Sequence, residues 1–182
     1  MTTYISMLRG INVGGRKKVK MDELKGLYES LGFGHVLTYI QSGNVVFEYE
    51  RTEIPRLVDR IEKAMKARFG FDVPVVIRTR DEIERVIGKT PFAGKDDSKV
   101  HVTFLSGKPT GFPTDEISRV KAAKEEFAFS DEEVYLFCPG GYGATKLSNG
   151  FLEKKLKRTA TTRNWRTVNV LLSMADQDLK SG

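Results

Sequence analysis

Apolar and polar positions follow two different periods along this chain, and the switches between the periods predict the order of helices and strands. Apolar residues that recur three and four positions apart predict a helix over residues 21–31, which Gly32 ends, and a longer helix over residues 54–65 with Pro55 in its first turn. Short β-branched and aromatic runs predict strands over residues 4–9, 36–41, 45–49 and 73–77. The resulting order β-α-β-β-α-β is the ferredoxin-like arrangement, a four-stranded antiparallel sheet with two helices on one face.

The second half of the chain repeats much of this order. A capping box at residues 79–82 predicts a short helix that ends at Gly88, and the polar stretch over residues 88–98 is the best candidate for a domain boundary. Beyond it we expect strands over residues 100–105 and 134–137, with residues 127–129 as a possible third strand, and three helices: over residues 114–126, from Ser148 to Leu156, and from a cap at Thr162.

The predicted fold class is therefore α+β. We expect a ferredoxin-like subdomain over residues 1–88 and a second, related α+β subdomain over residues 99–182 that carries two C-terminal helices and packs on the first.

Composition excludes few functions. A chain of 182 residues can form one sizeable core or two small ones. No apolar run reaches the roughly 20 residues that a membrane-spanning helix needs, and the N-terminus lacks the features of a signal peptide, so we expect no membrane partner. The single cysteine, Cys138, cannot form an internal disulfide, which favours a cytoplasmic location. Neither histidine has a second metal-binding residue at a suitable spacing, so no metal site is expected.

Positive charge is concentrated at the two ends of the chain. Residues 1–20 hold five basic residues and no acidic one, residues 140–182 hold eight basic residues against three acidic ones, and the whole chain carries +6. In both ends the charges accompany glycine-rich turns between a strand and a helix, where backbone N–H groups and cationic side chains can bind an oxyanion. The pattern predicts a binding site for an anion such as phosphate, although charge that serves solubility alone explains it equally well.

Four motifs supply the candidate anion-binding residues. They are the turn after the first strand, the hairpin turn between the second and third strands, the glycine-containing turn before Lys146, and the start of the last helix. Arginines at the start of a helix oppose the helix dipole, and a bound anion would relieve that conflict. The candidates are Arg9, Gly10, Asn12, Gly14, Gly15, Gln41, Asn44, Lys146, Arg163, Asn164 and Arg166. Hairpin geometry alone also explains Asn44, and Lys17 and Lys18 are interpreted as solvated surface.

Other chemistry finds little support in the sequence. The glycine motifs match neither the dinucleotide fingerprint nor the phosphate loop of nucleotide triphosphatases, so no cofactor is expected. Cys138 is better explained as a buried residue than as a nucleophile, and Trp165 is better explained as a core residue than as a platform for base stacking. No pair of carboxylates is placed for acid–base chemistry, so no catalytic residue is assigned.

The motifs carry a resemblance to a known family. The segments Leu8–Gly15, Tyr39–Phe47, Thr145–Ser148 and Thr162–Val168 are similar to those of the bacterial family called domain of unknown function 1697, and they bracket nearly the whole chain. The resemblance implies a two-part α+β fold with ferredoxin-like subdomains. It implies no activity.

Three classes of function stay open. The first is a binding protein for a phosphate-bearing ligand, with nucleic acid as one candidate, because ferredoxin-like modules can stack bases on sheet aromatics such as Tyr4, Tyr39, Phe47 and Tyr49. Those same rings could instead belong to the core or be covered by the second half of the chain. The second is an enzyme that acts on a small anionic or nucleotide-like substrate. The third is a structural protein whose basic ends contact an acidic partner.

Overall fold

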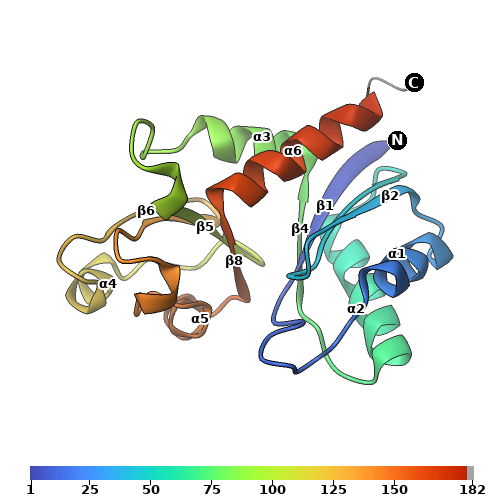
Figure 1. Ribbon diagram of the computed structural model, residues 1–182, viewed down its shortest axis with the longest axis horizontal. Coiled ribbons are helices and arrows are strands. Elements are labelled where there is room, and N and C mark those ends of the chain that lie inside the picture. The colour runs from blue at the N-terminus through green and yellow to red at the C-terminus, as the bar shows by residue number, and fades with distance from the viewer. Residues whose placement is uncertain (180–182) are drawn as a thin grey trace. The chain divides into compact units, whose positions relative to one another are not determined.

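Two four-stranded antiparallel sheets organise residues 1–179, the part of the chain that the computed structural model describes (Figure 1). Two compact units contain them: Met1–Glu84 with the end of the chain from Val170, and Arg85–Asn169. The first division falls within a helix over Arg80–Gly88, labelled α3, and the second within α6, Trp165–Leu179. In the described residues no helix is long and apolar enough to cross a membrane.

The first unit has the predicted β-α-β-β-α-β order. Its sheet runs β2-β3-β1-β4 with every neighbouring pair antiparallel, which confirms the α+β class. Figure 1 shows both helices on one side of this sheet. The elements are β1 (Thr2–Leu8), α1 (Met21–Ser30), β2 (Gly34–Tyr39), β3 (Asn44–Tyr49), α2 (Ile54–Phe69) and β4 (Val75–Thr79).

Alternation along the strands sends one set of side chains under the two helices. Tyr4 and Phe47 are cross-strand partners with ring centroids 5.6 Å apart, and Tyr28 of α1 meets Phe47 edge-on at 5.5 Å. Ile61 of α2 closes the same core. Tyr4 and Phe47 are fully buried, so these two of the four rings belong to the core and cannot stack bases, whereas Tyr39 and Tyr49 are only partly buried.

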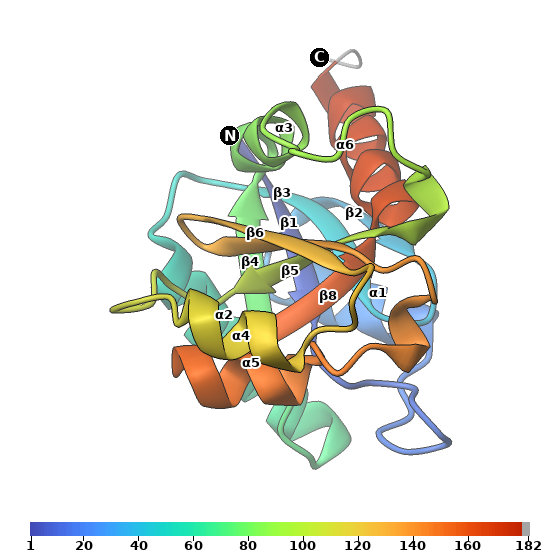
Figure 2. The same ribbon diagram turned by 90° about the vertical axis from the view of Figure 1, so that its left-hand side faces the viewer.

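The second unit has the same order of elements (Figure 2). Its sheet runs β6-β7-β5-β8, again with every neighbouring pair antiparallel. Ile117 and Leu152, one from each helix, pack with Val134 and Leu136 of the sheet. The elements are β5 (Val100–Leu105), α4 (Thr114–Val120), β6 (Glu126–Ser130), β7 (Glu133–Phe137), α5 (Asn149–Leu156) and β8 (Ala160–Asn164).

Two expectations for this unit are wrong. The helix expected over residues 114–126 ends at Val120, because the carboxylate of Glu125 accepts the N–H of Ala122 at 2.8 Å in a turn that leads into β6. The last helix is not capped by Thr162, which lies in β8. Asn164 provides that cap instead, because its Oδ1 accepts the N–H of Thr167 at 2.8 Å.

Equivalent hydrogen bonds, as well as the same topology, occur in each of the two units. The last residue of the first strand donates its N–H to the hairpin turn in both units, Leu8 to Gly43 at 2.9 Å and Leu105 to Glu132 at 2.8 Å. A carboxylate on the second helix accepts the first N–H of the last strand in both. The pairs are Val75 with Glu62 at 3.0 Å and Ala160 with Glu153 at 3.2 Å.

A buried arginine is repeated at the same place in the last strand of each unit. Arg78 and Arg163 are 4% and 7% exposed, and the Nη1 of each donates to the carbonyl of its preceding residue at 3.0 Å. A capping side chain follows directly in each unit, Thr79 before α3 and Asn164 before α6. The two units are therefore structural repeats down to single side chains, although the sequence shows no repeat by inspection.

Gly43 and Gly70 offer a matched test of how tightly the first hairpin packs. Both have φ values in the left-handed region, +85° and +82°, but a Cβ on Gly43 would lie 2.6 Å from Ile11 Cδ1 and 3.0 Å from Leu8 Cβ, whereas one on Gly70 meets nothing within 4 Å. We expect Gly70→Ala to lower the free energy of unfolding by about 1–2 kcal/mol through backbone strain alone. Gly43→Ala should cost about 1–3 kcal/mol more. Urea denaturation measures both, and equal losses would contradict this packing.

Candidate functional site

The loop over residues 9–20, called here the glycine loop, is held in one conformation by the side chain of Asn12. The Nδ2 of Asn12 donates to the carbonyl of Val19 at 3.0 Å and to the carbonyl of Gln41 at 2.8 Å. Its Oδ1 accepts the N–H of Val19 at 2.8 Å, and its backbone N–H donates to Lys17 at 3.1 Å. Asparagine suits this position because it tolerates the left-handed φ of +56° found here. One side chain therefore joins two of the predicted motifs.

The tip of the glycine loop is a tight turn rather than a flexible segment. Gly14 and Gly15 have φ values of +57° and +73°, and the N–H of Arg16 donates to the carbonyl of Val13 at 3.0 Å, which is type I′ geometry. Lys17 anchors the loop further by donating from Nζ to the carbonyl of Asp72 at 2.6 Å. Val13 stands out at the tip with 64% of its surface exposed.

The hairpin turn between β2 and β3 lies against this loop. The N–H of Gly43 donates to Ile40 at 3.2 Å, and the amide of Asn44 donates to the carbonyl of Tyr39 at 2.9 Å and to Ser42 Oγ at 3.1 Å. Asn44 is fully buried, so its amide closes the hairpin. Gln41 is exposed, and only its carbonyl is used by Asn12.

A cavity of about 810 Å³ lies beside the glycine loop, the hairpin turn and the start of α1. Three of the predicted residues, Asn12, Gly15 and Gln41, line it. The other lining residues are Lys18, Val19, Lys20, Met21, Asp22 and Glu23. Both lysines are exposed, so their ammonium groups are hydrated and free to reorient. The cavity therefore combines two cations with backbone and amide donors.

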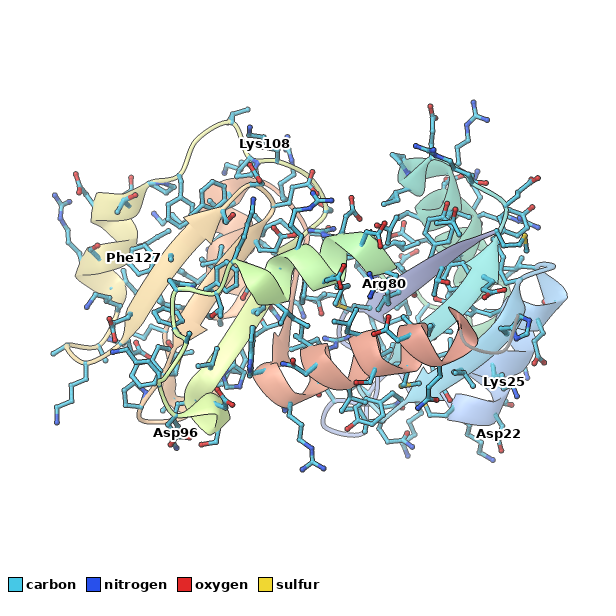
Figure 3. All side chains as sticks on the ribbon, turned by 90° about the horizontal axis from the view of Figure 1, so that it is seen from above. Asp22, Lys25, Arg80, Asp96, Lys108 and Phe127 are labelled. Carbon is cyan, nitrogen blue, oxygen red and sulfur yellow. The ribbon has the colours of Figure 1, made fainter. Side chains whose placement is uncertain are left out.

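The start of α1 contributes to the same cavity. Lys20 is the N-cap, and no side chain caps the helix there. The N–H groups of a first helical turn lack partners within the helix and favour negative charge. Asp22 and Glu23 already use this preference. Glu23 is also paired with Arg68 of α2 at 3.0 Å, whereas the carboxylate of Asp22, labelled in Figure 3, forms no hydrogen bond or ion pair with another residue in the described range.

The four candidates near the C-terminus lie in the second unit. Lys146 is exposed in the loop before α5, whose cap is Ser148 as predicted, with its Oγ accepting the N–H of Phe151 at 3.3 Å. Asn164 caps α6, and Arg166 is exposed in the first turn of that helix. The prediction that both basic ends of the chain share one site stays a prediction.

Arg163 corrects the sequence interpretation, because it lies in β8 and not in a helical turn. Its Nη1 donates to Thr161 Oγ1 at 2.7 Å and to the carbonyl of Thr162. Burial lowers the pKa of its guanidinium to about 10, which still leaves the group charged at neutral pH. The helix dipole argument for an anion at Arg163 therefore no longer applies, and only Arg166 lies within the helix.

The remaining reactive side chains fit structural roles. Cys138 is fully buried, and burial raises the pKa of its thiol to about 11, so little thiolate forms at neutral pH. His101 stacks on Tyr142 with ring centroids 4.9 Å apart, and burial lowers its pKa. No group of three or more His, Cys, Asp or Glu side chains in residues 1–179 is placed to hold a metal ion. Trp165 is only half-buried.

The candidates predicted from the sequence include none of the four charged residues of the cavity, Lys18, Lys20, Asp22 and Glu23. The sequence pattern of Lys18 is that of solvated surface. Asp22 and Glu23 are explained by the preference of a first helical turn for acidic residues. A usable signal was present, because Lys20 directly precedes the predicted helix at residue 21 and follows the glycine turn closely. A lysine at that junction indicates that positive charge lies at the end of the helix next to the glycine turn.

Replacing Asn12 tests whether its amide holds the loop. Asn12→Ala removes three hydrogen bonds and leaves the N–H and carbonyl of Val19 without this partner. We expect the free energy of unfolding to fall by about 1–3 kcal/mol, and amide hydrogen exchange of Val19 to accelerate far more than that of Ile77 in β4. Unchanged exchange at Val19 would show that the loop does not depend on Asn12.

Comparisons with known proteins agree with the fold. A solved structure titled as that of the conserved bacterial protein SP0830 from Streptococcus pneumoniae is similar to this chain, with a TM-score of 0.73 and 25% sequence identity. The match covers 96% of this chain and 98% of the other. A search of curated proteins gave no match. The model of a family described as a protein of unknown function, DUF1697, matches residues 1–135, and since this is most of the sequence, the chain belongs to that family.

Proposed function

We propose that this protein binds a small phosphate-bearing ligand, with the phosphate in the cavity beside the glycine loop. The observation that carries the proposal is the side chain of Asn12, which joins the loop to the hairpin turn directly beside that cavity. Lys18 and Lys20 supply positive charge there, and Gln41 supplies an amide. Backbone N–H groups of the α1 start add donors that favour an anion.

Preorganisation supports this proposal. The hydrogen bonds of Asn12, Arg16 and Lys17 fix the backbone of the loop without any ligand. A binding site whose backbone is already ordered loses less conformational entropy when a ligand arrives. Two exposed lysines then provide the long-range attraction, which salt should weaken.

The size of the cavity favours a small ligand over a nucleic acid strand. Small-molecule sites typically occupy about 300–1,000 Å³, and the 810 Å³ found here falls in that range. Two of the four sheet aromatics considered for base stacking, Tyr4 and Phe47, are buried in the core of the first unit. We assign no reaction, because no residue of the cavity is placed as a nucleophile beside a base.

The cellular setting belongs to the same proposal. We propose a bacterial, cytoplasmic protein. The similar solved protein is described as bacterial, and Cys138, the one cysteine in the sequence, is a free buried thiol.

A pair of double variants tests the proposed role of the lysines. Lys18→Gln with Lys20→Gln removes both cations of the cavity, whereas Lys25→Gln with Lys63→Gln removes the same charge from exposed pairs with Glu29 and Asp59. With pyrophosphate as the probe in isothermal titration calorimetry, we expect the first variant to lose about tenfold or more in affinity, which corresponds to about 1.4 kcal/mol. The second variant should stay within about twofold of the parent.

Higher salt should weaken binding to the parent protein and to the control, because exposed charges attract the probe. Equal losses in the two double variants would mean that only net charge matters, and the cavity would then have no special role. An absence of pyrophosphate binding to the parent protein would overturn the proposal outright.

A further inference from the structure

Asp22 is a side chain that phosphate binding alone does not explain. Its carboxylate lines the same cavity as Lys18 and Lys20, where it would repel a phosphate group. The neighbouring Glu23 is neutralised by Arg68 of α2, with 3.0 Å between Nη2 and Oε1. Asp22 has no such cation, and no hydrogen bond or ion pair joins its carboxylate to another residue among those described. The cavity is therefore lined by one exposed carboxylate without an ion pair in addition to its two lysines.

A helix start offers an ordinary explanation for this carboxylate. Acidic residues in a first turn interact well with the helix dipole, and Asp22 occupies such a position in α1. If Asp22 serves only the helix, its negative charge must weaken the binding of every anion to this cavity, whether or not the anion carries a hydroxyl group.

The dimensions and the lining of the cavity indicate a ligand larger than phosphate. A volume of about 810 Å³ leaves room for an organic group beside a phosphate. Apolar side chains also line the cavity: the buried Val19 between the two lysines in the sequence, and the partly exposed Met21 between Lys20 and Asp22. A carboxylate accepts hydrogen bonds from hydroxyl groups, and such charge-assisted bonds are short and strong.

We propose that the natural ligand is a phosphate ester of a hydroxylated compound, a sugar phosphate or a nucleotide, whose hydroxyl group donates to the carboxylate of Asp22. This inference rests on the proposed function, because it assumes that the phosphate lies near Lys18 and Lys20. The two lysines select the phosphate, and Asp22 selects the hydroxyl. A polyanion without hydroxyl groups meets repulsion at Asp22 and gains nothing in return.

Asp22→Ala separates the two explanations by the sign of its effects. Inorganic phosphate should bind the variant about two- to fivefold more tightly, because a repulsive charge is gone. Ribose 5-phosphate and adenosine monophosphate should bind at least about fivefold more weakly, because their hydroxyl groups lose a charged acceptor. Asp22→Asn removes the charge and keeps an oxygen acceptor, so it should improve phosphate binding equally and cost the esters less. Titration calorimetry with each probe measures these changes.

Glu29→Gln provides the matched control. Glu29 lies on the same helix, pairs with Lys25 at 3.7 Å, and does not line the cavity. Its replacement removes the same charge and should change the affinity for no probe by more than about twofold. Circular dichroism of each variant verifies that α1 remains folded.

The outcomes distinguish the inference from the function on which it rests. If none of the probes binds the parent protein, both fail. If phosphate binds and Asp22→Ala strengthens all probes alike, the proposed function stands and the hydroxyl role of Asp22 is overturned. If the esters bind the parent protein no more tightly than phosphate does, the hydroxyl role is overturned as well. Opposite changes for phosphate and for the esters are the result that supports it.

Discussion

The side-chain amide of Asn12 is the interaction on which the candidate site depends. It joins the two ends of the glycine loop through Val19 and joins that loop to Gln41 in the hairpin turn, so two segments that are separate in sequence share one set of hydrogen bonds. A glycine loop without this amide would have many conformations, because glycines at positions 14 and 15 restrict the backbone little. Gly43 of the hairpin turn also packs so closely against Ile11 of the glycine loop that no larger side chain fits there without a shift of its neighbours. The cavity is thus bounded by backbone whose position is fixed.

The internal repeat explains why the site lies where it does. Both units use the end of the first strand to bond the hairpin turn, and both use a helix carboxylate to start the last strand. These shared bonds hold the ferredoxin-like frame. The segment after the first strand differs: it covers residues 9–20 in the first unit and residues 106–113 in the second. The longer segment contains Asn12 and the lysines of the cavity. The proposed binding site therefore lies in the part that the repeats do not share.

Much of the fold could be predicted because apolar periodicity reports burial directly. The stripe Leu57, Ile61, Met65 is buried as its spacing requires, and the capping box at Thr79 and Glu82 forms. The strand β8 was missed because Thr162 has the chemistry of a helix cap, whereas pairing with β5, which is distant in sequence, places Thr161 and Thr162 in a strand. In the site, Asn12 and Gln41 were recognised as candidates, but no local pattern shows that the side chain of one binds the carbonyl of the other. Lys18 and Asp22 gain their interest only from a cavity formed by segments that the sequence keeps apart.

Amide chemical-shift mapping during a phosphate titration tests the central claim most directly, because it locates binding without any substitution. We expect chemical-shift changes concentrated at residues that line the cavity, such as Gly15, Lys18, Lys20 and Gln41, with saturation at a single dissociation constant. Amides of the first-unit core, such as those of Ile77 and Val45, should stay in place. Shifts confined to other surfaces, or small shifts spread evenly over exposed lysines and arginines, would contradict a phosphate site beside the glycine loop.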